Sequence, residues 1–451
     1  MRGEGGYWVA VGVAVVGLAA VVASGLTGAA VLILAALGTL MMGAVGSWMK
    51  RPVDESWLQS WVVLGFMAKV GGAFARYFMV QFIYGGIGDS LRYYNVGIDL
   101  AAIWRQGHIP ALTGSGSFGT QVVEAVTGGL FAIFTPDLLG GFVIFSMYSF
   151  LGQLGLYAAF RRWAEPHQLK PYAFVIFFFP TYAFWPSSIG KDALIIMFLG
   201  FCAYSIARLL EGFELRWIAP VALSMVGLGL IRIHIAALVA FGLVGALIVS
   251  KVRVGATFMT RSRKFITFAG AAFAVVIAVQ LIPQVVGLQL NDLGDVTPFA
   301  NEITRRTSES GTVASGGPVQ SVLDVPGAVA LVLFRPYIFE GTELQHLLAA
   351  GETTLILLFF IWKLPVILRN WGRWRTNAYL VFCTLYTLAF AVVFSVVRNL
   401  GIIARQRGQV LGFFMALVIG LGWNETKKAR AARVAREAKE AARTADSVTW
   451  A

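Results

Sequence analysis

The chain has 451 residues, of which 58% are hydrophobic and only 13% are charged, and its mean hydropathy is +0.74. This composition excludes a soluble domain, because a single core cannot bury so much apolar surface and many apolar runs approach the length of a bilayer span. The formal net charge of +13 does not indicate nucleic-acid binding, since the basic residues lie mainly between hydrophobic runs. The sequence therefore predicts an all-α, polytopic integral membrane protein that contacts lipids.

About twelve apolar segments have the length of transmembrane helices, and they form one transmembrane domain over residues 1–423. The first segment has features of a signal peptide, but its length and the apolar run that follows at once favour an uncleaved helical hairpin. The predicted spans are residues 7–23, 29–45, 58–84, 138–160, 172–185, 193–209, 217–231, 235–250, 265–286, 346–368, 376–397 and 408–423.

Charge predicts the orientation of these spans. If the N-terminus, five short connections and the tail at residues 424–451 are cytoplasmic, that side holds 24 of the 36 Lys and Arg residues and 10 of the 23 Asp and Glu residues. Its net charge is then +14, against −1 elsewhere, so both termini are predicted to be cytoplasmic and the tail to be a basic helix. The connections are residues 50–55, 161–170, 208–216, 251–264 and 363–375.

The stretch FWPSSIGKD at residues 184–192 interrupts two apolar runs and ends in the charged pair Lys191 and Asp192. Burying either charge alone in hydrocarbon would cost several kcal/mol, so the pair is predicted to face an aqueous cleft or a partner. Two interpretations fit this pattern. The stretch is the edge of a working site, or it is an interfacial turn in which Pro186 ends one helix and Ser188 caps the next.

Residues 85–135 are predicted to lie at the outer face next to this stretch. Apolar residues recur at helical spacing in residues 85–107, which indicates an amphipathic helix in the interface, with Asp89 at its start. Asp89 either faces a site or only caps that helix. Residues 119–135 are apolar but short and contain Glu124, which is typical of a segment that dips into the bilayer without crossing it.

Three further polar stretches are predicted on the outer side, namely the turn at residues 232–234, the loop at 287–345 and the connection at 399–409. The middle of the loop is small, polar and glycine-rich, which is typical of a mobile lid or of a disordered segment. Lys69 and Arg76 are seven residues apart, so they share one face of the third span and are expected to contact either substrate or an internal carboxylate.

These stretches carry the groups that a glycan-transferring enzyme would need at the outer face, where sugar donors are carried on polyprenyl phosphates. Such an enzyme uses a base beside the acceptor hydroxyl and cations for the leaving phosphate. Asp89 is the first candidate for the base and His234 the second, although His234 also suits a satisfied interfacial position. Arg405 and Arg407 equally suit an anchor of the last span. The candidate substrate- and phosphate-binding residues are Arg92, Tyr93, Lys191, Asp192, Arg232, Arg335, Glu340, Arg405 and Arg407.

An acidic residue in the first outer loop, followed by amphipathic juxtamembrane helices and many spans, resembles the polyprenyl-phosphate-dependent GT-C glycosyltransferases, with Asp89, Tyr93 and Tyr94 at the matching position. The stretches FWPSSIGKDAL, LIRIHIAAL, LFRPYIFEG and NLGIIARQRGQ are similar to polymerase-like membrane proteins of bacterial surface-polysaccharide loci. The resemblance implies a bacterial inner-membrane glycosyltransferase or polymerase that acts on a polyprenyl-phosphate-linked glycan, with Asp89 as base. The chain departs from it in lacking a paired Asp-Glu in the first outer loop and a sizeable soluble C-terminal domain.

Two other functions compete with this hypothesis. A transporter or flippase for a lipid-linked or anionic substrate would suit the intramembrane cations and the interrupted helix at Pro186 and Gly190, but it predicts an internal repeat that the sequence does not show. A noncatalytic membrane scaffold would leave the cluster of outer cations unexplained. The sequence indicates no metal-ligand set and names no cofactor.

Overall fold

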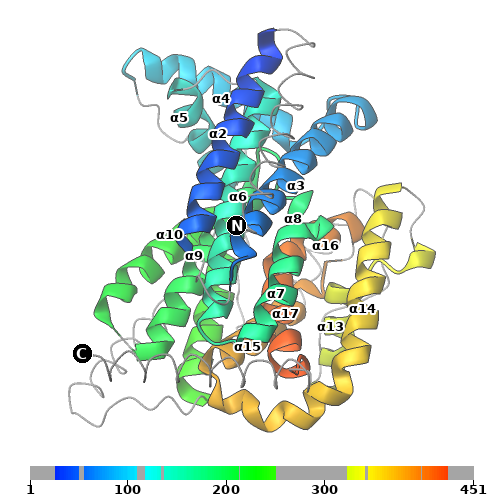
Figure 1. Cartoon of the computed structure of the whole chain (residues 1–451). Helices are drawn as coiled ribbons and strands as arrows, with labels where there is room; N and C mark the ends of the chain where they lie inside the picture. Colours follow the sequence, from blue (N-terminus) through cyan, green and yellow to red (C-terminus); the bar gives the residue numbers. More distant parts are fainter. Residues whose placement is uncertain are drawn as a thin grey trace, which may run out of the picture.

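The computed structural model describes residues 26–49, 55–108, 117–133, 137–212, 214–249, 322–340, 344–397 and 399–424, and every element in them is helical (Figure 1). Five helices are long and apolar enough to cross a membrane, or six if a bent pair is counted as one span. The all-α, multi-pass class is therefore confirmed. These helices are α3 Leu58–Phe78 with its π-helical end η1 Met79–Ile83, α6 Leu138–Arg161, α9 Lys191–Gly212, α10 Ile218–Val249, which is interrupted at Arg232, α14 Leu344–Asn370, and the pair α16 Leu400–Gln406 and α17 Gly408–Gly422, bent by 58°.

The remaining helices are shorter or fall below that test. They are α2 Leu26–Met49, α4 Asp89–Arg105, α5 Phe118–Ile133, α7 Pro166–Phe178, α8 Pro180–Ala183, α13 Val325–Phe334 and α15 Ala378–Phe394, with the 3₁₀ turns η2 Leu215–Trp217, η3 Val322–Asp324, η4 Ile338–Glu340 and η5 Trp371–Thr376. Helices α4 and α5 pack against each other, since a Cβ on Gly97 would lie 2.6 Å from Thr127 Cγ2. With sixteen residues, α5 is too short to span a bilayer, as the sequence predicts.

One predicted span is wrong. Residues 172–185 do not form a continuous helix, because Phe179 has an extended backbone (ψ 138°) between α7 and α8. The cause is Pro180, which disfavours helical geometry in the residue before it. The predicted spans at 7–23 and 265–286 lie outside the described residues, as do most of the outer loop and the tail. The number of twelve spans therefore stays a prediction.

The ends of α6, α9 and α14 and the basic residues beside them lie at one end of the bundle, the lower end in Figure 1, and contacts place nine of the described tryptophans there too. The indole of Trp163 donates to the Ala207 carbonyl (3.1 Å), and its own carbonyl accepts from the Asn377 amide (3.2 Å), so the ends of α6 and α9 meet the start of α15. Interfacial tryptophans and loop cations are typical of a membrane boundary. We call this the basic end. Its tryptophans are Trp48, Trp57, Trp61, Trp163, Trp217, Trp362, Trp371, Trp374 and Trp423, and its cations include Arg161, Arg162, Arg208, Lys363, Arg373 and Arg375.

Helix α10 departs from helical geometry at Arg232, where φ is −147° and ψ is 93°. Before this residue, the Trp217 ring lies 5.5 Å from the Tyr204 ring, and a Cβ on Gly227 would meet the Phe198 ring. From Trp217 to Gly227 the chain moves forward along α10, while its contacts on α9 move backward from Tyr204 to Phe198. The first arm of α10 therefore runs antiparallel to α9, away from the basic end.

The second arm of α10 runs back toward the basic end. The His234 ring lies 5.6 Å from the Phe394 ring, and a Cβ on Gly242 would lie 3.1 Å from the Phe382 ring, so this arm is antiparallel to α15. Helices α9 and α15 themselves run in opposite directions, because the end of one and the start of the other meet at the basic end. The chain consequently turns at Arg232 on the opposite end of the bundle, where the sequence predicts a turn.

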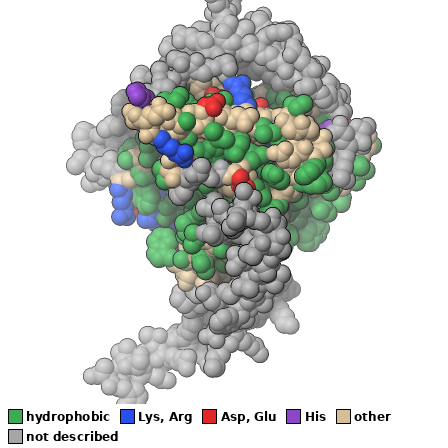
Figure 2. Space-filling view, turned by 90° about the horizontal axis from the view of Figure 1, so that it is seen from above, with side chains coloured by type: hydrophobic (Ala, Val, Ile, Leu, Met, Phe, Trp, Pro, Cys, Tyr) green, Lys and Arg blue, Asp and Glu red, His purple; other side chains and the backbone are tan. Residues whose placement is uncertain are grey.

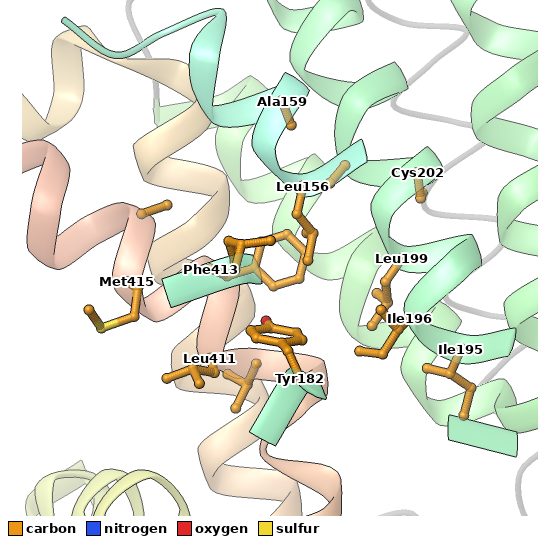
Figure 3. Packing of buried hydrophobic residues seen from close by; sticks show 14 of the residues in the cluster. Leu156, Ala159, Tyr182, Ile195, Ile196, Leu199, Cys202, Leu411, Phe413 and Met415 are labelled. Atoms are coloured by element: carbon orange, nitrogen blue, oxygen red, sulfur yellow. The ribbon is translucent and has the colours of Figure 1, made fainter. Parts of the chain in front are cut away.

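Helices α6 and α9 form the core with their backbones in contact. A Cβ on Gly200 would lie only 1.9 Å from the Gly152 carbonyl oxygen, so no other residue fits there. Small residues at such crossings let membrane helices gain van der Waals contact. Figure 3 shows the ring of Tyr182 from α8 lying between Leu411 of α17 and Ile196 of α9. The short helix α8 is thereby fixed between two spans.

We expect the substitution Gly200→Ala to lower the stability of the folded protein by about 3 kcal/mol, because the added methyl group forces two backbones apart. Gly229→Ala is the matched control, since a Cβ there meets nothing within 4 Å and alanine favours the helix. The thermal unfolding midpoint of each purified protein in detergent measures the difference. Equal midpoints for the two variants would contradict the packing of α6 against α9.

Candidate functional site

The Asp192 carboxylate, at the end of the bundle opposite the basic end, is the centre of a group of charged side chains. It is buried, with 7% of its side chain exposed, and it accepts a hydrogen bond from Arg405 Nε. Its other oxygen lies 3.7 Å from Arg232 Nη2. Arg405 also reaches Asp89, with Nη1 3.4 Å from Oδ2. We call Arg76, Asp89, Lys191, Asp192, Arg232 and Arg405 the Asp192 cluster.

Local sequence explains how these side chains are presented. Asp192 occupies the first turn of α9, where the partial positive charge of the helix favours a carboxylate. Asp89 is the first residue of α4 and follows Gly88, whose φ of 149° favours glycine. Arg405 lies on α16, a short helix capped by the Asn399 carboxamide, which accepts from the backbone N–H of Ile402 at 3.0 Å. With Arg76 on α3 and Arg232 on α10, five separate elements therefore meet at the cluster.

Arg76, near the end of α3, completes the cluster from below. Its guanidinium lies over the rings of Phe184 and Trp185, 5.2 and 5.4 Å from their centres. It also interacts electrostatically with Asp192 and Asp89. Its Nε atom is buried without a hydrogen-bond partner among the described residues. The predicted contact with an internal carboxylate is not formed by Arg76 among the described residues, and its charge acts on Asp192 and Asp89 from beyond ion-pair distance.

Lys191 and Tyr93 line the same group. Lys191 Nζ donates to the Ser117 hydroxyl at 3.1 Å, a partner that the sequence does not signal because Ser117 lies in a glycine- and serine-rich connection. Tyr93 is 3% exposed and hydrogen-bonds Thr120. Burial, together with the nearby charge of Asp89, raises the pKa of Tyr93 to about 12. The phenol therefore stays protonated at neutral pH and acts as a hydrogen-bond donor rather than a base.

His234 lies just after the turn of α10, beside the cluster. Its ring packs against Phe394, and it interacts electrostatically with Arg232 and Lys191. Both neighbours are cations. The structure thus places His234 beside the Asp192 cluster. Asp89, with 64% of its side chain exposed, is the more accessible of the two base candidates.

Four other predicted site residues lie outside the cluster. Arg92 forms an ion pair of 2.9 Å with Glu124, which ties α4 to α5. Arg335 is paired with Glu340, five residues along the chain. Burial alone would raise the pKa of Glu340, but hydrogen bonds from Arg335 and from the Tyr337 N–H lower it. These three side chains therefore have partners close to their own elements.

Arg407, the fourth of these residues, is fully buried at the bend between α16 and α17. It interacts electrostatically with Glu352 of α14 and not with Asp192. Lys69, on the same face of α3 as Arg76, donates to the Tyr182 carbonyl and likewise lies apart from the cluster.

The cluster contains four basic and two acidic side chains, so its net charge is +2. Such a group attracts a dianion, because guanidinium and ammonium donors bind phosphate oxygens well. Figure 2, seen from above, shows a basic side chain with acidic ones beside it among hydrophobic side chains. In the described part of the chain, no group of three His, Cys, Asp or Glu residues is placed to hold a metal ion.

No protein-family model, no curated protein and no solved structure matches this chain. Its class is therefore defined by its own features. It is a multi-pass helical membrane protein with a partly buried, net positive charge cluster at one end of the bundle.

We expect Arg405→Gln to lower the stability by about 3–5 kcal/mol, because it leaves Asp192 buried with the more distant Arg232 as its nearest counter-ion. Arg216→Gln is the matched control. It breaks the exposed pair with Glu214, and exposed pairs contribute about 0–1 kcal/mol. Thermal unfolding of the purified proteins measures both effects. A loss for Arg405→Gln no greater than that of the control would show that Asp192 does not depend on this partner.

Proposed function

We propose that the protein is a glycosyltransferase or polymerase of envelope polysaccharide assembly that uses a polyprenyl-phosphate-linked sugar donor. The observation that carries the proposal is the exposed Asp89 carboxylate, 3.4 Å from Arg405 at the edge of a cluster with a net charge of +2. A carboxylate beside several fixed cations supplies both groups that transfer from a phosphate-linked donor requires, namely a base and an anion-binding surface.

In this proposal Asp89 accepts the proton of the acceptor hydroxyl as the hydroxyl oxygen attacks the anomeric carbon. The bond from that carbon to the phosphate oxygen breaks, and the phosphate leaves with the electron pair. Lys191, Arg232 and Arg405 stabilise the negative charge that develops on it. Asp192 holds the two guanidinium groups in place through its own contacts with them. His234, beside Arg232, is the second candidate for the base.

We infer that the basic end faces the cytoplasm and the Asp192 cluster faces outward, in the cytoplasmic membrane of a bacterium. Three predicted cytoplasmic connections and nine of the thirteen tryptophans lie at the basic end. Cytoplasmic loops are rich in Lys and Arg, and tryptophans concentrate at membrane interfaces, so both observations support this orientation. Both termini of a chain with twelve spans would then be cytoplasmic. An outward cluster would meet lipid-linked donors and no soluble nucleotide sugars.

The variant Asp89→Asn tests this function, with Asp99→Asn as the matched control. Both residues lie on α4, and Asp99 is exposed on the helix away from the cluster. We expect Asp89→Asn to abolish surface glycan and to leave the lipid-linked intermediate in the outer leaflet, because the acceptor proton loses its base. Asp99→Asn should keep the wild-type level. Wild-type glycan in the Asp89→Asn strain would remove Asp89 from the reaction.

A transporter or flippase is the second candidate function, and one observation favours it. Lys69 is buried in the middle of α3 and donates to the carbonyl of Tyr182 in α8, a short helix separated from α7 by a break. Buried ionisable groups beside interrupted helices are typical of transport sites. The same assay separates the two functions, since loss of transport would leave the intermediate in the inner leaflet. Unchanged glycan in every cluster variant would favour a scaffold.

A further inference from the structure

The bend between α16 and α17 contains buried polar atoms that lack partners. Arg407 is 0% exposed, and none of its three guanidinium nitrogens has a hydrogen-bond partner in the described part of the chain. The same is true of Oε1 of Gln406 and of both side-chain polar atoms of Gln409. Six such atoms therefore occur within four consecutive residues.

Glu352 does not satisfy Arg407. The two side chains interact electrostatically, but within the described residues no carboxylate oxygen lies within 4.0 Å of the guanidinium. Both oxygens of Glu352 are instead used by Thr181, whose backbone N–H and hydroxyl donate to them at 3.1 and 2.8 Å. Glu352 thus offsets part of the charge from a distance and accepts none of the five N–H groups.

A guanidinium stays charged in proteins and has no accepting atom, so each of its donors needs an acceptor when it is buried. Leaving such a group unpaired costs several kcal/mol. Arg407 also caps the N-terminal end of α17, a helix of fifteen residues, whose partial positive charge is offset only in part by the opposite end of the seven-residue α16. These two features together favour an anion at the bend.

We propose that Arg407 and the N-terminal end of α17 form a buried binding site for a small oxyanion of the phosphate type, distinct from the Asp192 cluster. Arg405 and Arg407 are two residues apart on a helical stretch, so their side chains project in nearly opposite directions. One contacts Asp192 and the other faces Glu352. The planar guanidinium fork suits two oxygens of one oxyanion. This inference does not depend on the proposed enzymatic function.

Calorimetric titration of inorganic phosphate into the full chain, purified in nanodiscs of zwitterionic lipid, tests the site. Besides any phosphate binding at the Asp192 cluster, we expect a separate binding event that Arg407→Gln weakens at least about tenfold, equivalent to 1.4 kcal/mol. Lys191→Gln, a variant in the Asp192 cluster, should leave that event unchanged. The unfolding midpoint of Arg407→Gln without phosphate checks that it is folded. Phosphate binding that depends only on Lys191, or none at all, would overturn the proposal.

Glu352→Gln provides a test that keeps Arg407 in place. It removes a like charge near the bound oxyanion and retains an acceptor for Thr181, so we expect it to tighten phosphate binding about tenfold. Unchanged or weaker binding would contradict the site. A short-chain prenyl phosphate separates the sources of the oxyanion. If the prenyl phosphate competes with inorganic phosphate for the Arg407-dependent event, the site binds the phosphate group of a larger ligand. If it does not compete, the site binds the free ion.

Discussion

The arrangement of helices at the end that carries the cluster depends on burial of the Asp192 carboxylate. A buried carboxylate keeps its charge only with opposite charges in contact, and Arg405 and Arg232 supply them from α16 and α10. Both helices are irregular at this point, since α10 turns at Arg232 and α16 ends in a bend of 58°. Irregular backbone at membrane depth is tolerated where it is enclosed by protein. The buried charges therefore depend on the broken helices that carry them, and the broken helices depend on the ion pairs that hold them together.

Asp89 and Asp192 carry the same side chain but differ in exposure and in the number of their ionic partners. Asp192, with 7% exposure, is committed to its ion pairs, whereas Asp89, with 64% exposure, shares only one guanidinium nitrogen at 3.4 Å. Arg405 contacts both, so a single side chain joins the fixed carboxylate to the accessible one. A ligand that binds Arg405 would consequently be adjacent to Asp89, and the proposed division between positioning and proton transfer follows from this geometry.

Much of the cluster was predictable because hydropathy and charge assign each polar stretch to a side of the membrane. That reasoning brought residues 184–192, Asp89 and Arg405 to one side, although Asp192 and Arg405 are 213 residues apart. It could not separate Arg92, Arg335 and Glu340 from the cluster, because an ion pair with a neighbouring element leaves no hydropathy signal. It also treated Arg405 and Arg407 alike, although a helical step of two residues directs them to opposite sides.

The sequence by itself determined that the protein is all-helical with several apolar segments of membrane-spanning length, because the bilayer imposes length and apolarity on each segment separately. Only the tertiary structure decided which charged side chains contact one another and that α10 turns back along α15. These outcomes depend on packing between helices distant in sequence. The direct contact of Gly152 with Gly200 is one such case, since it places α9, and with it Asp192, at a fixed height against α6.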